Sequence, residues 1–556
     1  MKDNRLLLLL KKYWVILAVV LIALAAVFSS VEIYKEEVLN IDPDVKYQKQ
    51  KTLYFAAESI DTLNPLISQS EDTYYLSKLI YNSLFEYDEN LSAVPELVKS
   101  YKVNTDRAYI EMTLKKGIKW HNGKTLKADD VRFTVNAIKA AGSTSPYYAK
   151  ASKIVAVNVT GTYQCNIYFN NNYNCSLDDL TFPIVPSSQY GNAYQFAKAK
   201  DGFKPVGTGM YQYRSYNYLK YLRLNPNEDY FNKEQKADNK IYVNVIPKRS
   251  LAENLMEIDT VTCYLDDSSA RRSIVSDKDY QMYDVLSNQV EMIVYNTKSK
   301  ILKNKDVRQA VSYGIDREKI LANAYMGGGV LSDTIYYPNY LGVADEGNAY
   351  AYDYQKAQQM LLSAGLADRN GDGTLEDMNG DAVTLRIVVN KKNATRTAAA
   401  RLIEKNLETI GIRSEVRALT TKEYQAAISA CDFDVLLTGY RMEESYDLRS
   451  FFDRTNPWGY INYDLLASVR ELSRLHTEAE YREAFAALKT QMLDEMPYYP
   501  LCYRYTGLIG VTTFKAEMLP MFNDVYKNCN TWSWSKVIKP DTAETDAETA
   551  QESEQN

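Results

Sequence analysis

Histidine is scarce in this sequence, and that scarcity excludes several kinds of site. The 556 residues contain only two, His121 and His476. A histidine metal cluster is therefore excluded, and a Ser/His/Asp triad has almost nowhere to form. The G-x-S-x-G elbow of secreted hydrolases is also missing. We therefore expect a protein that is not an enzyme, with no catalytic residues, no metal site and no cofactor.

Cysteine is almost as rare and is not arranged in pairs. None of the six cysteines falls in a C-x-x-C motif, which removes the usual zinc and redox spacings. If the chain lies outside the cell, Cys165 can pair with Cys175 and Cys502 with Cys529. Buried free thiols are the alternative, and the sequence leaves both open.

Clustered positive charge is lacking as well. The formal net charge is −6, the pI is near 5.4, and Lys and Arg are scattered. This pattern argues against a nucleic-acid partner. The chain is long enough for two or three domains. Its 47 tyrosines suit ligand-binding surfaces, but they are also common in exported proteins.

The N-terminal residues predict export. Residues 1–12 are basic, residues 13–31 form an apolar run long enough to span a bilayer, and the linker 32–49 begins with acidic residues. The positive-inside rule then places the rest of the chain on the extracytoplasmic side of the cell membrane. We prefer an uncleaved, single-pass signal anchor. A cleavable signal peptide, cut near Ala23 to Ala26, is the alternative.

The opposite end of the chain has a different composition. Residues 540–556 are rich in acidic side chains and contain no aromatic residue, so we expect a disordered tail. No cysteine lies near the apolar run, so a lipid-modified cysteine cannot serve as the anchor.

The second half of the chain alternates between helical and strand periodicity, which indicates an α/β domain. The expected helices are 306–324, 354–364 and 395–410, and the expected strands are 385–389 and 433–437. In the first half we expect strands at 51–57 and 109–114, a strand pair within 154–169, and helices at 72–84 and 127–139. Ligands of α/β domains bind beyond the strand ends.

The stretch Gly439–Asp453, GYRMEESYDLRSFFD, lies at such a strand end. It follows the apolar residues 435–437 and alternates carboxylates with aromatic rings, as binding loops do. A solvated surface loop is the alternative. From the residues alone, the candidate ligand contacts are Tyr440, Glu443, Glu444, Tyr446 and Asp447.

Two other motifs favour turns. The glycines of Gly207–Met210 lack both the Walker lysine and the third glycine of a dinucleotide loop. Asp368, Asn370, Asp372, Gly373 and Glu376 match EF-hand positions one, three, five, six and nine, but position twelve is an asparagine. A solvated turn is favoured there, and bound calcium stays open.

Several stretches, taken in order, resemble the extracytoplasmic solute-binding proteins of ABC importers, in the family 5 branch of oligopeptide- and dipeptide-binding proteins. They are TLNPL (62–66), IKWHNGKTLKADDVRFTV (118–135), GTGMYQY (207–213), DVRQAVSYGIDREKIL (306–321) and YDYQKAQQMLLSAG (352–365) followed by NGDG.

The resemblance implies an α/β fold of the type II periplasmic-binding-protein class, a two-lobed clamp of three domains. By analogy, domain I comprises residues 50–85, 203–290 and 501–538. Domain II, an accessory domain, comprises 86–202, and domain III comprises 291–500. Hinge closure would trap the ligand and present the closed face to a permease.

The resemblance also implies a site. The family pattern GWxxDYxDPxxF falls on Gly439, Tyr440 and Glu443, where Glu443 replaces the Asp that pairs with a peptide's α-amino group. Asn64, in the N-terminal turn, is a further expected ligand contact. The tryptophan has become tyrosine, and the proline is missing.

The expected function is that of a monomeric binding protein that delivers peptides to the permease of an ABC importer. The alternative is a membrane-tethered sensor, or a receptor for a non-peptide solute, such as a nickel complex, a glycan or a cationic small molecule.

Overall fold

A computed structural model describes residues 46–538, except for 90, 105–106, 171–175, 269–270, 443–447, 473–474, 476–477 and 518–520. The described residues fall into two units, residues 46–50 with 534–538 and residues 51–533. In the first unit, β1 (Lys46–Lys49) pairs antiparallel with β19 (Ser535–Ile538). No helix within the described residues is long and apolar enough to cross a membrane. The expected anchor at 13–31 and tail at 540–556 lie outside those residues.

The second unit is built on one eleven-stranded mixed sheet. Its strands in chain order are β2 (Thr52–Ala57), β9 (Tyr211–Asn217), β10 (Tyr221–Pro226), β11 (Lys240–Val245), β12 (Cys263–Asp266), β13 (Gln281–Tyr295), β14 (Gly329–Val330), β15 (Thr384–Asn390), β16 (Arg413–Leu419), β17 (Val435–Arg441) and β18 (Tyr498–Gly510). The spatial order is β16-β15-β17-β13-β18-β12-β2-β11-β10-β9, with β14 paired to β18.

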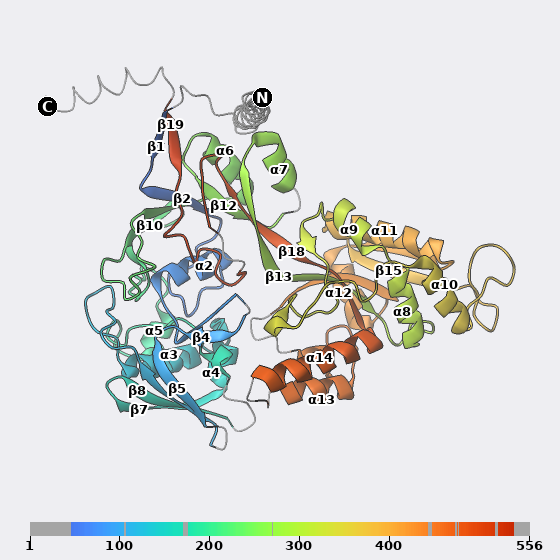
Figure 1. Cartoon of the computed structure of the whole chain (residues 1–556), viewed down its shortest axis with the longest axis horizontal. Coiled ribbons are helices and arrows are strands. Elements are labelled where there is room, and N and C mark those ends of the chain that lie inside the picture. Colours follow the sequence, from blue (N-terminus) through green and yellow to red (C-terminus); the bar gives the residue numbers. More distant parts are fainter. Residues whose placement is uncertain are drawn as a thin grey trace, which may run out of the picture. The chain divides into compact units, whose positions relative to one another are not determined.

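The two longest strands, β13 and β18, connect the two halves of this sheet (Figure 1). The two strands pair with each other, the last part of β18 pairs with β12, and the last part of β13 pairs with β17. We call β2, β9–β12 and the helices packed on them lobe A, and β15–β17 with theirs lobe B. The pairing of β13 with β18 is interrupted between Leu286 and Val290.

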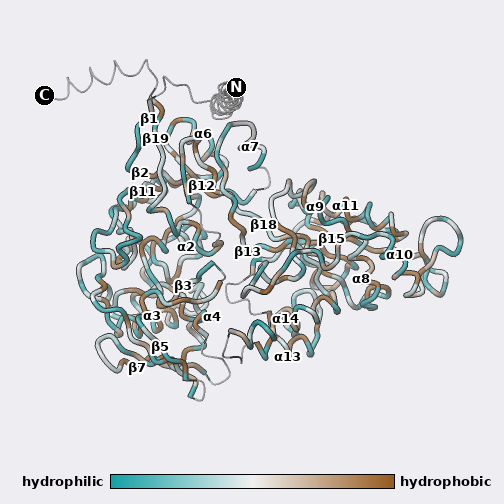
Figure 2. Tube along the Cα trace, in the orientation of Figure 1, coloured by the Kyte–Doolittle hydropathy of each residue, from teal (hydrophilic) through white to brown (hydrophobic). Residues whose placement is uncertain are grey.

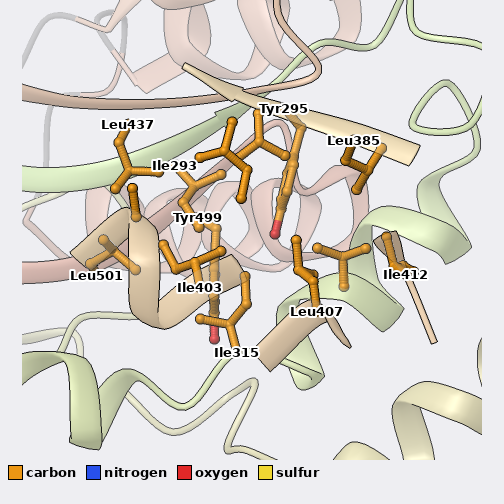
Figure 3. Close-up of a cluster of buried hydrophobic side chains, with 14 of the residues drawn as sticks. Ile293, Tyr295, Ile315, Leu385, Ile403, Leu407, Ile412, Leu437, Tyr499 and Leu501 are labelled. Atoms are coloured by element: carbon orange, nitrogen blue, oxygen red, sulfur yellow. The ribbon is translucent and has the colours of Figure 1, made fainter. Parts of the chain in front are cut away.

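Lobe B is an α/β sandwich, because its strands are apolar on both faces. Ile293 and Tyr295 of β13 face one core, and Met292 and Val294 face the other. Figure 3 shows the first core, where Leu385, Leu437 and Tyr499 meet Ile403 and Leu407 of a helix. Hydrophobic segments run along these strands, and hydrophobic and hydrophilic residues alternate along the helices beside them (Figure 2).

The helices of the second unit are α2 (Glu71–Ile80), α3 (Ala128–Ala141), α4 (Tyr148–Ser152), α5 (Ala193–Lys198), α6 (Ala252–Glu257), α7 (Arg271–Lys278), α8 (Lys305–Tyr313), α9 (Arg317–Asn323), α10 (Tyr354–Ser363), α11 (Ala394–Thr409), α12 (Thr421–Ala430), α13 (Tyr463–Leu472) and α14 (Glu478–Glu495). Short 3-10 turns are η1 (Gly142–Thr144), η2 (Leu177–Leu180), η3 (Arg249–Leu251), η4 (Tyr340–Gly342) and η5 (Arg449–Phe451).

Two smaller sheets lie between β2 and β9 in the sequence. One pairs β3 (Phe85–Tyr87) with β4 (Ala93–Pro95). The other has the order β5-β6-β8-β7, formed by β5 (Val98–Asn104), β6 (Tyr109–Leu114), β7 (Ile154–Gly161) and β8 (Gln164–Phe169). Helix α3 packs against β7 and α5.

Most of the expected elements are confirmed, and one expected helix is wrong. Residues 306–324 form α8 and α9, because the chain turns at Gly314 and the Asp316 side chain caps α9 by accepting from the backbone N–H of Lys319. Cys502 and Cys529 are buried free thiols, so a disulfide between them is also wrong. Cys165 is a buried free thiol, and Cys175 lies outside the described residues.

Candidate functional site

A cavity of about 240 Å³ is lined by side chains from both lobes. Lobe A contributes residues of the turn before α2, the first two turns of α2, and Phe522 and Asn523 near the C-terminus. The opposite side is formed by Asn288 of β13 and Arg441 of β17, and Tyr147 comes from the small domain between β2 and β9. Segments far apart in the sequence thus enclose one space of the size of a few amino-acid side chains.

An ion pair joins the two lobes beside this cavity. The Arg441 guanidinium binds the carboxylate of Glu71 in the first turn of α2. Burial is the largest single influence and lowers the pKa of Arg441, but the charge and hydrogen bond of Glu71, together with Tyr75 and Asp267, raise that pKa above its ordinary value. The Tyr75 hydroxyl also contacts Glu71 at 3.3 Å. Because both charged side chains are about half exposed, the pair adds little to stability, but it marks where the lobes meet.

Hydrogen bonds fix the start of the Gly439–Asp453 stretch. The Met442 backbone N–H donates to the Asn288 carbonyl at 2.9 Å, and the Asn288 amide donates back to the Met442 carbonyl at 2.6 Å. The Tyr440 ring packs edge-on against Phe451 and Trp458, with centroids 4.9 and 6.0 Å away. Tyr440 thus lies at the base of the stretch, half-buried and packed on rings.

The other four candidate ligand residues of this stretch, Glu443, Glu444, Tyr446 and Asp447, lie outside the described residues. Their role in binding stays a prediction. The described chain resumes at Leu448, which is buried, so both ends of the segment are held in the fold.

A buried ion pair lies beneath Gly439. The Arg396 guanidinium donates to both carboxylate oxygens of Glu291 at 2.7 and 3.0 Å, and Glu291 is 1% exposed. Tyr325 and Gln289 donate to the same carboxylate at 3.2 and 2.9 Å. A Cβ at position 439 would lie 1.9 Å from an Arg396 nitrogen, so only glycine leaves room for this pair.

Asn64 is fully buried and its side chain is used within the fold. Its amide donates to the carbonyls of Phe196 and Ala199, both at 2.9 Å, and its Oδ1 accepts from the N–H of Leu66. These contacts hold the TLNPL turn against α5. The expected contact between Asn64 and ligand stays a prediction.

Two of the stretches that resemble family motifs, residues 118–135 and 207–213, meet at the C-terminal end of α2. The His121 Nδ1 accepts from the N–H of Gly207 at 3.2 Å, and Nε2 donates to the Gly209 carbonyl at 3.1 Å. A Cβ on Gly207 would lie 1.7 Å from the Ile80 carbonyl oxygen, so the glycine turn packs directly on the helix backbone. Burial lowers the pKa of His121 to about 4, so the ring is neutral at pH 7.

The acidic turn brings three carboxylates together. Oxygens of Asp368, Asp372 and Glu376 lie within 4.8 Å of one another. Asp368 already accepts from the N–H groups of Gly371 and Gly373, and Glu376 accepts from the N–H of Arg369. These bonds are those of a self-contained turn, and calcium binding stays untested.

Reasoning from the sequence missed Glu71, Asn288 and Arg441. Arg441 stands inside the stretch that the sequence singled out, but attention to carboxylates and rings passed over it. Glu71 offered no signal, because an acidic residue at a helix N-terminus is commonplace.

Comparison with known proteins identifies the family. Residues 92–458, well over half of the chain, match the profile of the bacterial extracellular solute-binding proteins, family 5. The chain belongs to this family. The oligopeptide-binding protein AppA of Bacillus subtilis is 25% identical over 464 residues, covering 79% of this chain and 83% of that protein.

Solved structures of family 5 proteins share the fold. The B. subtilis AppA structure with a nonapeptide gives a TM-score of 0.59 at 22% identity, covering 88% of this chain and all of that one. NikA from Brucella suis with Fe(III)-EDTA gives 0.70 at 18% identity, covering 87% and 99%. The second unit therefore has the two-lobed α/β fold of solute-binding proteins.

Proposed function

We propose that this family 5 protein is the extracytoplasmic substrate-binding component of an ABC importer, which captures peptides between its lobes and delivers them to the permease. The observation that carries this proposal is the cavity lined from both lobes and bridged by Glu71 and Arg441. A solute held there contacts both lobes at once, so its binding free energy favours the closed arrangement.

Peptide is the favoured solute class for two reasons. The relative AppA is named as an oligopeptide-binding protein. The cavity lining combines aromatic rings, such as Tyr74 and Tyr147, with neutral polar groups, such as Gln69 and Asn288. Such a lining suits a chain of amide groups and mixed side chains.

In this proposal, Glu443 holds the free α-amino group of the peptide, with Tyr440 packing nearby and Glu444, Tyr446 and Asp447 as further contacts. A carboxylate facing an ammonium in a closed cleft is favourable, because each charge offsets the desolvation of the other. Asn64 remains a proposed contact at the lobe A side.

The function is tested by thermal unfolding of the full chain, purified in detergent, with a diverse peptide library. A peptide at a hundredfold excess over its Kd should stabilise the protein by about 2.7 kcal/mol. An absence of stabilisation across the library would contradict peptide binding.

The role of Glu443 is tested separately with Glu443→Gln. The variant should bind free-amine peptides more weakly and bind N-acetylated peptides as the parent does. Titration calorimetry of both peptide types measures this. An equal loss for both types, or none for either, would remove Glu443 from the proposed role.

A non-peptide solute, or a sensory role, is the second candidate. The replacement of the family's Asp and Trp by Glu443 and Tyr440 favours it, as does the likeness to NikA, whose structure holds Fe(III)-EDTA. Permease and ATPase genes beside this gene would support import, and calorimetry with nickel–histidine would test the nickel alternative.

The remaining parts of the proposal concern architecture. We assign three domains with the boundaries given above, a membrane anchor at residues 13–31 and a monomeric state. Alkaline extraction of membranes tests the anchor: the protein should stay in the pellet, and its release would contradict anchoring. Light scattering of the purified chain tests the monomer.

A further inference from the structure

Among the described residues that line the cavity, Glu71 and Arg441 are the only charged ones. They come from opposite lobes, and Glu71 is the described carboxylate that pairs with the Arg441 guanidinium. Each side chain is about half exposed, so both have accessible surface as well as contact with each other. The cavity is therefore bordered by an arginine whose counter-ion is a side chain of the protein itself.

The guanidinium of arginine is a planar fork whose N–H groups match the two oxygens of a carboxylate. In the structure, Glu71 supplies that carboxylate to Arg441. A carboxylate of the solute has the same charge and the same geometry, so exchanging one for the other keeps Arg441 neutralised. An amide carries no charge, and it would leave the guanidinium without a counter-ion.

Glu71 can leave Arg441 at a small cost in free energy. A half-exposed ion pair contributes little, and Glu71 lies in the first turn of α2, where the helix dipole also stabilises a negative charge. The Tyr75 hydroxyl, which contacts Glu71 at 3.3 Å, also bonds to the Phe522 carbonyl at 3.1 Å. Its proton therefore keeps a partner when Glu71 moves away.

The reverse exchange, in which an ammonium of the solute takes Glu71 from Arg441, is less favourable. Burial is the largest single influence on the pKa of Arg441 and lowers it, so the guanidinium is already partly desolvated. Arg441 lies at the end of β17 and forms no second ion pair with a described residue. An ammonium bound to Glu71 would leave this partly buried cation unpaired, which is costly.

We propose that Arg441 binds a carboxylate of the captured solute, and that Glu71 holds this position until the solute displaces it. The inference rests on the proposed function and makes it more specific, because the preferred solutes are then acidic. On a peptide, the carboxylate belongs to an Asp or Glu side chain or to the C-terminus. Both sources have the same chemistry, and the test separates them.

The test is titration calorimetry of the full chain in detergent, with tripeptides that all keep a free α-amino group. The first arm compares Glu with Gln at one position of C-terminally amidated peptides, and the position is moved along the peptide. The second arm compares a C-terminal carboxylate with a carboxamide in peptides without acidic side chains. In one of the arms, the carboxylate peptide should bind about tenfold more tightly, the value of roughly one charge-assisted hydrogen bond.

Two variants should change this preference in opposite directions. Arg441→Met removes the binding group, so the preference should disappear. Glu71→Gln removes the internal competitor, so carboxylate peptides should bind up to about fivefold more tightly and the preference should grow. Arg417→Met is the matched control: Arg417, also on lobe B, pairs with the half-exposed Asp432 but does not line the cavity, so the preference should persist.

Three outcomes would overturn the inference. They are peptide binding without a preference in either arm, a preference that survives in Arg441→Met, or an equal loss of affinity for carboxylate and amide peptides in Glu71→Gln. The last outcome would show that the pair only holds the lobes together. A failure of every peptide to bind would instead overturn the proposed function, and the inference with it. The two failures are therefore distinguishable.

Discussion

The two ends of helix α2 contrast sharply. At its C-terminal end, the glycine turn 207–209 packs on the helix backbone, and His121 satisfies both ring nitrogens there. At its N-terminal end, the same helix borders a cavity and reaches lobe B through a half-exposed ion pair. One end is packed without free space, and the other borders a cavity. The difference shows that one helix can anchor the fold at one end and line a cavity at the other.

We expect the largest effect on stability from Gly207→Ala, which disrupts the closely packed C-terminal end of α2. Its Cβ would lie 1.7 Å from a backbone oxygen of α2, so the turn must move away from the helix. We expect a loss of about 4 kcal/mol or more in the free energy of unfolding, measured by urea denaturation. Gly191→Ala is the control, because its Cβ would meet only the end of the flexible Gln195 side chain. Equal stability of the two variants would contradict the packing described.

Glu291→Gln tests a second region in which the polar groups are paired within the protein, the buried ion pair beneath Gly439. The change leaves the buried Arg396 charge without its counter-ion. We expect a loss of about 3 kcal/mol. Urea denaturation of Glu291→Gln and of the double variant Glu291→Gln/Arg396→Met measures it. The double variant should recover part of the loss, and a greater loss in it would refute the pairing argument.

A pH titration tests whether His121 is buried at the closely packed C-terminal end of α2. Because burial depresses its pKa to about 4, the folded state disfavours the protonated ring. The contribution of the neutral His121 ring to the free energy of unfolding is therefore fully present above the unfolded pKa of about 6.5. This contribution is lost as the pH falls towards 4. NMR of the imidazole signals should show one histidine titrating near pH 4. A signal for His121 that titrates near pH 6.5 would contradict the burial of its ring against the glycine turn 207–209.

The smallest effect is expected at the open end of α2. Glu71 and Arg441 are 42% and 49% exposed, so Glu71→Gln or Arg441→Met should change stability by less than about 1 kcal/mol. A double-mutant cycle in urea measures the coupling free energy. Coupling well above that value would show that this end of the helix is built for stability too.

Local pattern predicted much of the fold. Helix α10 and strands β6 and β15 fall within a residue of the expected bounds, because their apolar periodicity is regular. The break between α8 and α9 was missed because the apolar face continues across Gly314, while the Asp316 cap competes with it locally. The order of family motifs in the sequence correctly indicated the two-lobed fold.

The site was harder to predict, because its parts are distant in sequence. Glu71 and Arg441 are separated by 370 positions, and Glu291 and Arg396 by 105. Neither pair leaves a periodic signal. Gly439 was noticed as part of a motif, but its physical reason, the room needed by Arg396, came only from the fold.

The interruption in β13 has a mechanical consequence. Ser287 to Gln289 fall outside the register between β13 and β18, and it is there that Asn288 exchanges two hydrogen bonds with Met442. We expect the backbone to twist more readily at this point than along the paired parts of the strand, because these residues are outside the β13–β18 ladder. A twist there would move Met442 or break both of its hydrogen bonds to Asn288, and would thus reach the start of the candidate loop.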